Sequence, residues 1–152
     1  PPGFTIRPMA GEAELEEYVT LHRTAFGTEN MTLDYRRSIM SAPDYLPGLD
    51  LVAVAPDGRL AAFCVCQVFP DDSPRAGGTR EGWTDPIGTA PDFQRMGLSK
   101  ALMLAGMRLL KERGIDTVLL GTSSTNLAMQ RTAESLEFQK VSNTLWYSRQ
   151  VG

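Results

Sequence analysis

The stretch most capable of chemistry is residues 87–100, IGTAPDFQRMGLSK, in which a strand ends, the chain turns and a helix begins. The first N–H groups of a helix have no intrahelical partner and carry partial positive charge, so they bind anions where nothing bulky blocks the approach. Gly97 and Ser99 keep this approach open, and Arg95 and Lys100 add cationic side chains at its mouth. We predict a pyrophosphate site and a nucleotide-tailed ligand. An ordinary loop before an amphipathic helix is the alternative, because one glycine is a weak signal.

The two cysteines, Cys64 and Cys66, are separated by one residue within an apolar run. Residues i and i+2 of a strand share a face about 6–7 Å apart, whereas a disulfide needs Cβ atoms about 3.8 Å apart. We therefore expect two separate thiols, which suit a reducing cytoplasm. No second Cys/His pair completes a zinc site, and no metal is predicted.

The elements that must position the 87–100 segment follow from hydrophobic periodicity and turn residues. The first half of the chain is predicted to contain a strand at 4–8, a helix from about 11 to 26, a short helix from near Thr32 to Met40, and hairpin strands at 51–54 and 60–69. A strand across Thr79–Thr89, a helix from Leu98 that ends before Gly114 and a strand at 117–120 follow. The last elements are a helix capped by Ser124, Thr125 or Asn126, with Met129, Ala133 and Leu136 on its buried side, and two strands between 138 and 148. Pro86 cannot donate to a ladder, so it predicts a bulge or a splayed strand. The order indicates a mixed α/β (α+β) sheet with helices on its faces, not a regular Rossmann repeat.

Composition places limits on the class of protein. The 152 residues fit one domain, 1–152, and their hydrophobic share of 42% is ordinary for a globular protein. A net charge of −3 gives no reason to expect nucleic acid, and no apolar run approaches a membrane span. The first residues have no signal-peptide pattern, so we expect a cytoplasmic protein. The chain begins with Pro1 rather than Met, which suggests a processed product or a fragment of a longer or tandem protein.

The same segment resembles the cofactor motif of the GNAT family of N-acetyltransferases, Gln/Arg-x-x-Gly-x-Gly/Ala, as Gln94 to Ser99. The flanking family patterns appear as Pro91–Phe93 and Lys100–Leu102, and a second motif is matched by Asn126 and Phe138. The element order also agrees, so the resemblance covers nearly the whole chain. It implies the GNAT fold: a central mixed, mostly antiparallel sheet with a splayed central strand and helices on both faces.

The resemblance implies a coenzyme A site. Backbone amides from Arg95 to Lys100 would hold the pyrophosphate, the splayed strand would pair with the pantetheine arm, and one of its N–H groups would polarise the thioester carbonyl. The later helix would line the other side of the cofactor. The implied cofactor-binding residues are Ile87, Gly88, Thr89, Gln94, Arg95, Met96, Gly97, Leu98, Ser99, Lys100, Asn126 and Met129.

The chain departs from the family pattern at three positions. Ser99 replaces the usual Gly or Ala but keeps its N–H, and Glu137 replaces a Gly at a helix end. Ala133 stands where many members carry a Tyr that protonates the departing thiolate. The usual general acid is therefore missing.

Other side chains would have to move protons. Asp85 and Glu81 are candidate bases for the attacking amine, and Tyr147 is a candidate replacement acid. Their structural alternatives are exposed strand-end carboxylates and a half-buried packing tyrosine. His22 lies on the apolar stripe of the first helix, where a packing role is favoured over a catalytic one.

The leading hypothesis is an acyltransferase that moves an acetyl or short acyl group from acetyl-CoA to an amine by a direct ternary complex. A catalytically degenerate CoA-binding or regulatory module is the alternative, and a site for another nucleotide is a third. The expected partners are a small-molecule amine or a peptide, with no nucleic acid and no membrane. An edge strand near residues 145–147 would be able to pair two copies into a homodimer.

Overall fold

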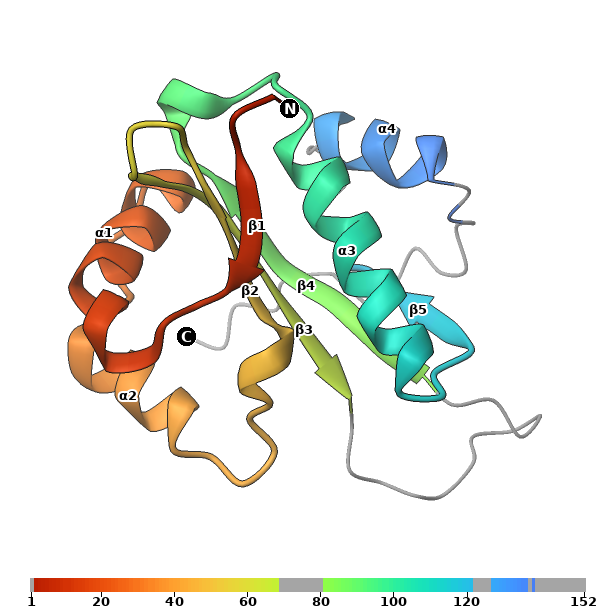
Figure 1. Ribbon diagram of the computed structural model, residues 1–152, viewed down its shortest axis with the longest axis horizontal. Coiled ribbons are helices and arrows are strands. Elements are labelled where there is room, and N and C mark those ends of the chain that lie inside the picture. Colours follow the sequence, from red (N-terminus) through yellow and green to blue (C-terminus); the bar gives the residue numbers. More distant parts are fainter. Residues whose placement is uncertain (1, 69–80, 122–126, 137, 139–152) are drawn as a thin grey trace, which may run out of the picture. The chain divides into compact units, whose positions relative to one another are not determined.

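Figure 1 shows a computed structural model of the protein, which describes residues 2–68, 81–121, 127–136 and 138. The chain divides into two compact units, residues 1–119 and 120–152. The first unit contains β1 (Thr5–Pro8), the 3-10 turn η1 (Gly11–Glu14), α1 (Leu15–Phe26), α2 (Leu33–Met40), η2 (Pro47–Leu49), β2 (Asp50–Val54), β3 (Leu60–Val68), β4 (Glu81–Thr89), η3 (Pro91–Phe93), α3 (Leu98–Glu112) and β5 (Thr117–Leu119), and the second contains α4 (Leu127–Ser135).

The described strands form one sheet in the order β1-β2-β3-β4-β5. The pairs β1–β2, β2–β3 and β3–β4 are antiparallel, and β4–β5 is parallel. The β2–β3 hairpin turns through residues 55–59, where Ala55 N–H donates to the Arg59 carbonyl at 2.8 Å. A helix, α3, joins the parallel pair, as a parallel connection requires. The sheet is therefore mixed and mostly antiparallel.

One face of the sheet is covered by α1 and α2 (Figure 1). Strand residues alternate between faces, and Val52, Phe63 and Val65 point to this side, where they join a core with Tyr18 and Val19 of α1. Tyr18 and Phe63 pack ring against ring, with centroids 5.3 Å apart. The helical spacing predicted a stripe from Leu15 to Phe26, which is confirmed at Leu15, Tyr18 and Val19, whereas Phe26 is exposed and the buried Leu21 lies outside the predicted stripe.

This layer encloses a buried ion pair. The guanidinium of Arg36 on α2 pairs with the carboxylate of Asp50 at the start of β2, and both side chains are almost fully buried. The Tyr45 hydroxyl also donates to Asp50, and Arg36 lies 4.0 Å above the Tyr18 ring. Burial raises the pKa of Asp50 despite these partners, which act in the opposite direction. The pair ties α2 to the sheet.

The opposite face is covered by α3, and its spacing is unusually tight. The buried residues of α3 recur largely every fourth position: Leu98, Leu102, Met103, Gly106 and Leu110. A Cβ at Gly106 would lie 2.4 Å from Cys66 Sγ on β3, so the helix backbone rests directly on the strand. The sulfurs of Cys64 and Cys66 are 3.8 Å apart, well beyond an S–S bond of about 2.05 Å.

Helix ends agree with the predicted ones where the structure describes them. Gly27 caps α1 in the left-handed region at φ 63°, and the Thr32 hydroxyl accepts from Tyr35 N–H at the start of α2. In the second unit, Met129, Ala133 and Leu136 are half-buried. The residues predicted for the buried side of that helix are therefore partly covered, but none of them is fully buried. A single-sequence stripe marks the less exposed side of a helix but not how deeply it is covered.

Some predicted elements cannot be compared with the structure, and the predicted absence of a membrane span can be compared only in part. The predicted helix cap at 124–126 and the strand pair at 139–148 lie outside them. Within them, no helix is both long enough and apolar enough to cross a bilayer.

Candidate active site: the end of β4 and the start of α3

The last part of β4 contains a bulge. Cys64 pairs with Ile87 and Cys66 pairs with Thr84, so one residue of β3 stands opposite two residues of β4, Asp85 and Pro86. Proline has no N–H for the ladder and is found at such irregularities. The predicted bulge at Pro86 is therefore confirmed.

Beyond this bulge the two edges of β4 differ. Its pairing with β5 runs only from Glu81↔Thr117 to Trp83↔Leu119, whereas β4 itself continues to Thr89. On the other edge, β3 stays paired as far as Ala62↔Thr89. Among the residues described here, the segment 84–89 thus has a β3 neighbour but no β5 neighbour, which is the geometry expected of a splayed strand.

The turn after β4 uses two left-handed residues. After η3, Arg95 has φ 64° and Gly97 has φ 81°. A Cβ at Gly97 would meet no atom within 4 Å, so glycine is needed here for its backbone angle and not to avoid a clash within the protein. A positive φ is uncommon for a residue other than glycine and recurs at functional sites. Arg95 is therefore held in a costly conformation at the centre of the motif.

The first turn of α3 is left open by the protein. Its first helical hydrogen bond runs from Ala101 N–H to the Gly97 carbonyl at 3.0 Å, which leaves the N–H groups of residues 98–100 without a helical partner. Among the residues that the structure describes, no side chain caps this end, and its first turn, Leu98 to Ala101, contains no acidic residue. By contrast, α2 has the Thr32 cap and Asp34. Such an end carries partial positive charge that suits an anion.

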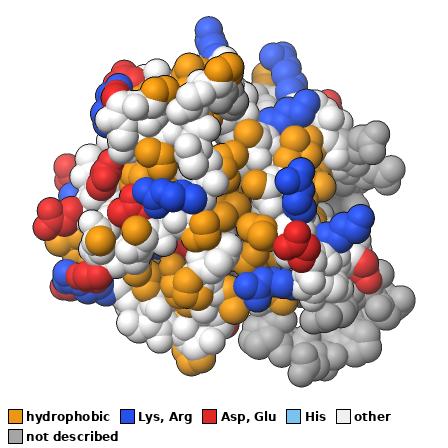
Figure 2. Space-filling view, in the orientation of Figure 1, with side chains coloured by type: hydrophobic (Ala, Val, Ile, Leu, Met, Phe, Trp, Pro, Cys, Tyr) orange, Lys and Arg blue, Asp and Glu red, His pale blue; other side chains and the backbone are white. Residues whose placement is uncertain are grey.

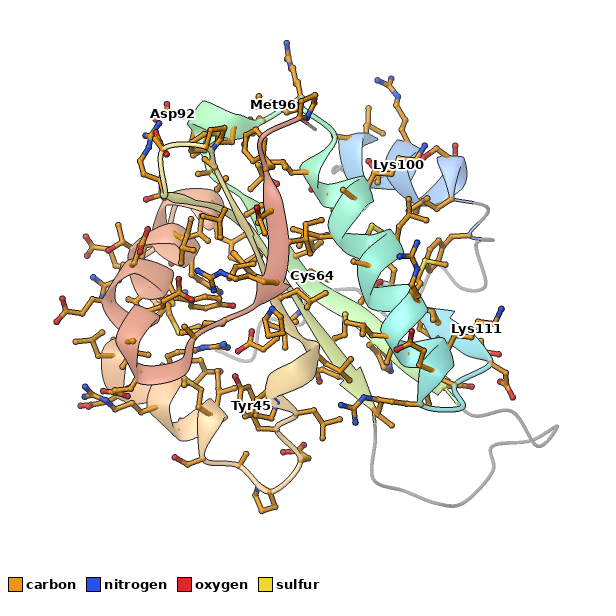
Figure 3. All side chains as sticks on the ribbon, viewed as in Figure 1. Tyr45, Cys64, Asp92, Met96, Lys100 and Lys111 are labelled. Atoms are coloured by element: carbon orange, nitrogen blue, oxygen red, sulfur yellow. The ribbon has the colours of Figure 1, made fainter. Side chains whose placement is uncertain are left out.

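Basic side chains border this open end. Arg95 and Lys100 are exposed, and Figure 2 shows basic side chains projecting at the edge of the molecule where the turn lies. Asp92, Met96 and Lys100 lie along this edge in Figure 3, whereas Lys111 marks the opposite end of α3. Electrostatically, this edge favours a negatively charged group.

Contacts from the β2–β3 hairpin hold the turn in place. The guanidinium of Arg59 lies 4.8 Å over the Phe93 ring and 3.7 Å from the carboxylate of Asp92. Phe93 also meets Phe4 edge to face, with the ring centroids 5.9 Å apart. No local sequence pattern predicts this support, because residues 4, 59 and 93 are far apart in the chain and meet only through strand pairing.

The structure brings some predicted site residues together. Ile87, Gly88 and Thr89 form the end of β4, and residues 94–100 form the turn and the first helical turn beside it. The Thr89 and Ser99 hydroxyl oxygens are 3.1 Å apart, a contact that the sequence analysis did not anticipate.

The predicted proton carriers are less completely described. Glu81 is half-buried at the first residue of β4, at the end remote from the turn. Asp85 lies in the bulge, but its side chain is outside the described part, as are Asn126 and Tyr147. Met129 belongs to the second unit. Their roles stay predictions.

His22 packs against the other side of the same region. Its ring stacks on Phe63 at 5.3 Å and meets Phe26 edge to face at 4.7 Å, while Phe63 is paired with Gly88 of β4. Burial lowers the pKa of His22, and the charge of Arg36 adds to that effect. The neutral ring is part of the apolar layer, in agreement with the predicted packing role.

Comparison with known proteins now identifies the family. The sequence pattern of the acetyltransferase (GNAT) family matches residues 13–138, which is most of the chain. The chain belongs to the acetyltransferase (GNAT) family. The predicted family and fold class are confirmed, and membership of an acetyltransferase family agrees with the predicted enzyme class and cofactor.

Individual relatives point the same way. The mycothiol acetyltransferase of Kineococcus radiotolerans is 33% identical over 150 residues, which cover 96% of this chain and 46% of that protein. The ribosomal-protein-S18-alanine N-acetyltransferase from Escherichia coli has a TM-score of 0.72 and 25% identity, covering 91% of this chain and 79% of that one. Aminoglycoside N-acetyltransferase AAC(6')-Iy in complex with CoA has a TM-score of 0.76 over 97% of this GNAT chain and 95% of its own, and at 21% identity it shows the shared fold.

The chain spans about half or less of the length of the curated relatives it matches. That residues 1–152 form one complete domain, and that two copies pair, stay predictions.

Proposed function

We propose that this GNAT chain transfers an acetyl group from acetyl-CoA to a primary amine in a direct ternary complex. The observation that carries the proposal is the open start of α3, where Gly97 at φ 81° leads into a first turn without a cap or an acid. The N–H groups of residues 98–100 would bind the pyrophosphate, and Arg95 and Lys100 would add charge. The segment 87–89 of β4 would pair with the pantetheine arm through its open edge.

The chain's own groups would then serve the transfer. Acetyl-CoA supplies the acetyl group as a thioester. A backbone N–H of the open β4 edge would donate to the carbonyl oxygen as negative charge develops on it. Asp85 or Glu81 would take the proton that the attacking amine must lose, directly or through water. With Ala133 at the usual tyrosine position, Tyr147 is the candidate donor to the leaving sulfur.

The acceptor is proposed from the relatives. Their names refer to mycothiol, aminoglycosides and a protein alanine, and in each case the group open to N-acetylation is an amine of the acceptor before transfer. We propose desacetylated mycothiol as the first acceptor to test, followed by an aminoglycoside and a peptide with N-terminal alanine. A net charge of −3 is compatible with attraction of a cationic amine.

A pair of lysines on one helix gives a matched test of the cofactor site. Lys100 lies in the first turn of α3 and Lys111 in its last, and both are exposed. Lys100→Ala should weaken CoA binding about threefold by calorimetry, with the loss reduced at high salt, because an exposed charge pair contributes about 0.2–1 kcal/mol. Lys111→Ala should bind CoA like the parent. Equal effects of the two substitutions would contradict the assignment.

Transfer is tested separately from binding. Thiol release from acetyl-CoA across the three acceptors should be detected for at least one of them. Asp85→Asn should abolish release with CoA affinity intact if Asp85 is the base, and Glu81→Gln should do so if Glu81 is. Tight CoA binding with no thiol release from any acceptor would favour the alternative, a CoA-binding module without its own chemistry.

A further inference from the structure

The last residue of β4 and the first turn of α3 are joined by a side-chain hydrogen bond. The Thr89 and Ser99 hydroxyl oxygens lie 3.1 Å apart, and both residues are half-buried. The bond bridges the base of the turn 90–98, which contains the left-handed residues Arg95 and Gly97. It therefore closes the turn at the point where the strand stops and the helix starts.

The bond depends on a residue that departs from the family motif. The family motif places Gly or Ala at the position of Ser99, and neither carries a hydroxyl. Other contacts hold the turn against β3 and the β2–β3 hairpin: Arg59 lies on Phe93, and Ala90 N–H donates to the Ala61 carbonyl at 2.9 Å. Among the contacts that the structure describes, the Thr89–Ser99 bond is the side-chain link between β4 and the open first turn of α3.

We propose that Thr89 and Ser99 are positioning residues that set the pyrophosphate end of the coenzyme A site against its pantetheine end. The inference rests on the proposed function, in which the end of β4 receives the pantetheine arm and the start of α3 receives the pyrophosphate. Coenzyme A spans both ends of the site, so its affinity depends on the position of one end relative to the other. A fragment that binds at only one end has an affinity that does not depend on this relative position. Preorganisation of this kind raises affinity by reducing the ordering needed on binding.

The test compares whole coenzyme A with its two parts. Ser99→Ala and Thr89→Val each remove one hydroxyl and keep the backbone N–H groups. We expect each to weaken CoA binding and to raise the KM for acetyl-CoA about three- to tenfold, with a much smaller change in kcat. Inhibition by 3′-phospho-ADP and by pantetheine, titrated separately, should stay within about twofold of the parent value.

Three further variants make the result specific. The double variant Ser99→Ala/Thr89→Val should bind CoA about as weakly as either single variant, because both substitutions remove the same bond. Thr89→Ser keeps a hydroxyl at this position and should therefore retain most of the parental affinity for CoA. Ser38→Ala is the matched control, since its hydroxyl bonds to the Tyr35 carbonyl at 2.6 Å on the exposed side of α2, and it should not alter CoA binding.

Several outcomes would overturn the inference. The first is an equal loss of affinity for 3′-phospho-ADP and for whole CoA, which would indicate a direct phosphate contact. The second is additive effects on CoA affinity in the double variant, and the third is unchanged CoA affinity in both single variants. Failure of the parent protein itself to bind CoA would instead reject the proposed function, so the two failures are distinguishable. The thermal midpoint of each variant identifies any general loss of folding.

Discussion

A methyl group added at Gly106 should destabilise this protein although it sits in the middle of a helix. Replacement of glycine by alanine in an exposed helix usually stabilises by about 1 kcal/mol. Here the added Cβ would lie 2.4 Å from Cys66 Sγ, 3.6 Å from Thr84 Cγ2 and 3.9 Å from Leu51 Cδ1. The first distance is at least about 1 Å shorter than the 3.5–4.0 Å at which heavy atoms pack.

The overlap has few ways to relax. Cys66 is only 4% exposed, and its Sγ already lies 3.8 Å from Cys64 Sγ, so the close-packed interior limits how far this sulfur can move away. The remaining relief is a displacement of α3 away from β3. Overpacking of a close-packed interior costs about 1–3 kcal/mol, and the tightness of this contact places Gly106→Ala in the upper part of that range. After the helix gain, we expect a net loss of about 1–2 kcal/mol.

A second substitution tests the cause. Cys66→Ala alone removes one buried sulfur and should cost about 1 kcal/mol. In the double variant Gly106→Ala/Cys66→Ala the new methyl group occupies the space that the sulfur leaves. The double variant should therefore be more stable than Gly106→Ala alone, with a coupling of about 1–3 kcal/mol.

Urea unfolding gives these free energies, and the thermal midpoint should fall by about 2–4 °C per kcal/mol for a domain of this size. Because α3 begins at the proposed pyrophosphate site, Gly106→Ala should also weaken CoA binding, and Cys66→Ala should restore it in the double variant. Gly106→Ala with parental or higher stability would refute the reasoning. So would purely additive effects of the two substitutions.

Three other predictions concern the turn, the buried ion pair and the first helix. Gly97→Ala should weaken CoA binding about fivefold by calorimetry, because a non-glycine residue at φ 81° costs about 1–2 kcal/mol; affinity equal to the parent would show that the turn adapts freely. Arg36→Met should cost about 3–5 kcal/mol in urea unfolding, since it leaves the Asp50 carboxylate buried without its cation, and Asp50→Asn combined with it should cost less than the sum of the two single losses; full additivity would contradict this. Burial lowers the pKa of His22 below its unfolded value of about 6.5, so its neutral form stabilises the fold fully above about pH 6.5, and that stability is lost as the pH falls towards the folded pKa. His22→Phe should therefore flatten the decline in unfolding free energy between pH 7.5 and 5.5, and a parallel decline in both proteins would exclude this histidine as its cause.

The sequence by itself determined much of the fold, and it indicated where the proposed cofactor site lies. Local signals were sufficient for α1 and its Gly27 cap, for the hairpin at residues 55–59 and for α3, because periodicity and turn chemistry act over a few neighbouring residues. Pro86 predicted the irregular strand for the same reason, since a missing N–H is a property of that residue wherever it lies. The motif from Gln94 to Ser99 then indicated the family.

The tertiary structure decided which distant residues support that site. Only sheet pairing and helix packing bring together the residues of three contacts: Arg59 with Phe93, Thr89 with Ser99, and Gly106 with Cys66. No local pattern encodes such contacts, because their distance depends on the register of strands far apart in the chain. The open end of α3 depends on both the sequence and the tertiary structure. Its residues could be identified from the sequence, but the left-handed Arg95 and Gly97 and the uncapped first turn are properties of the folded chain.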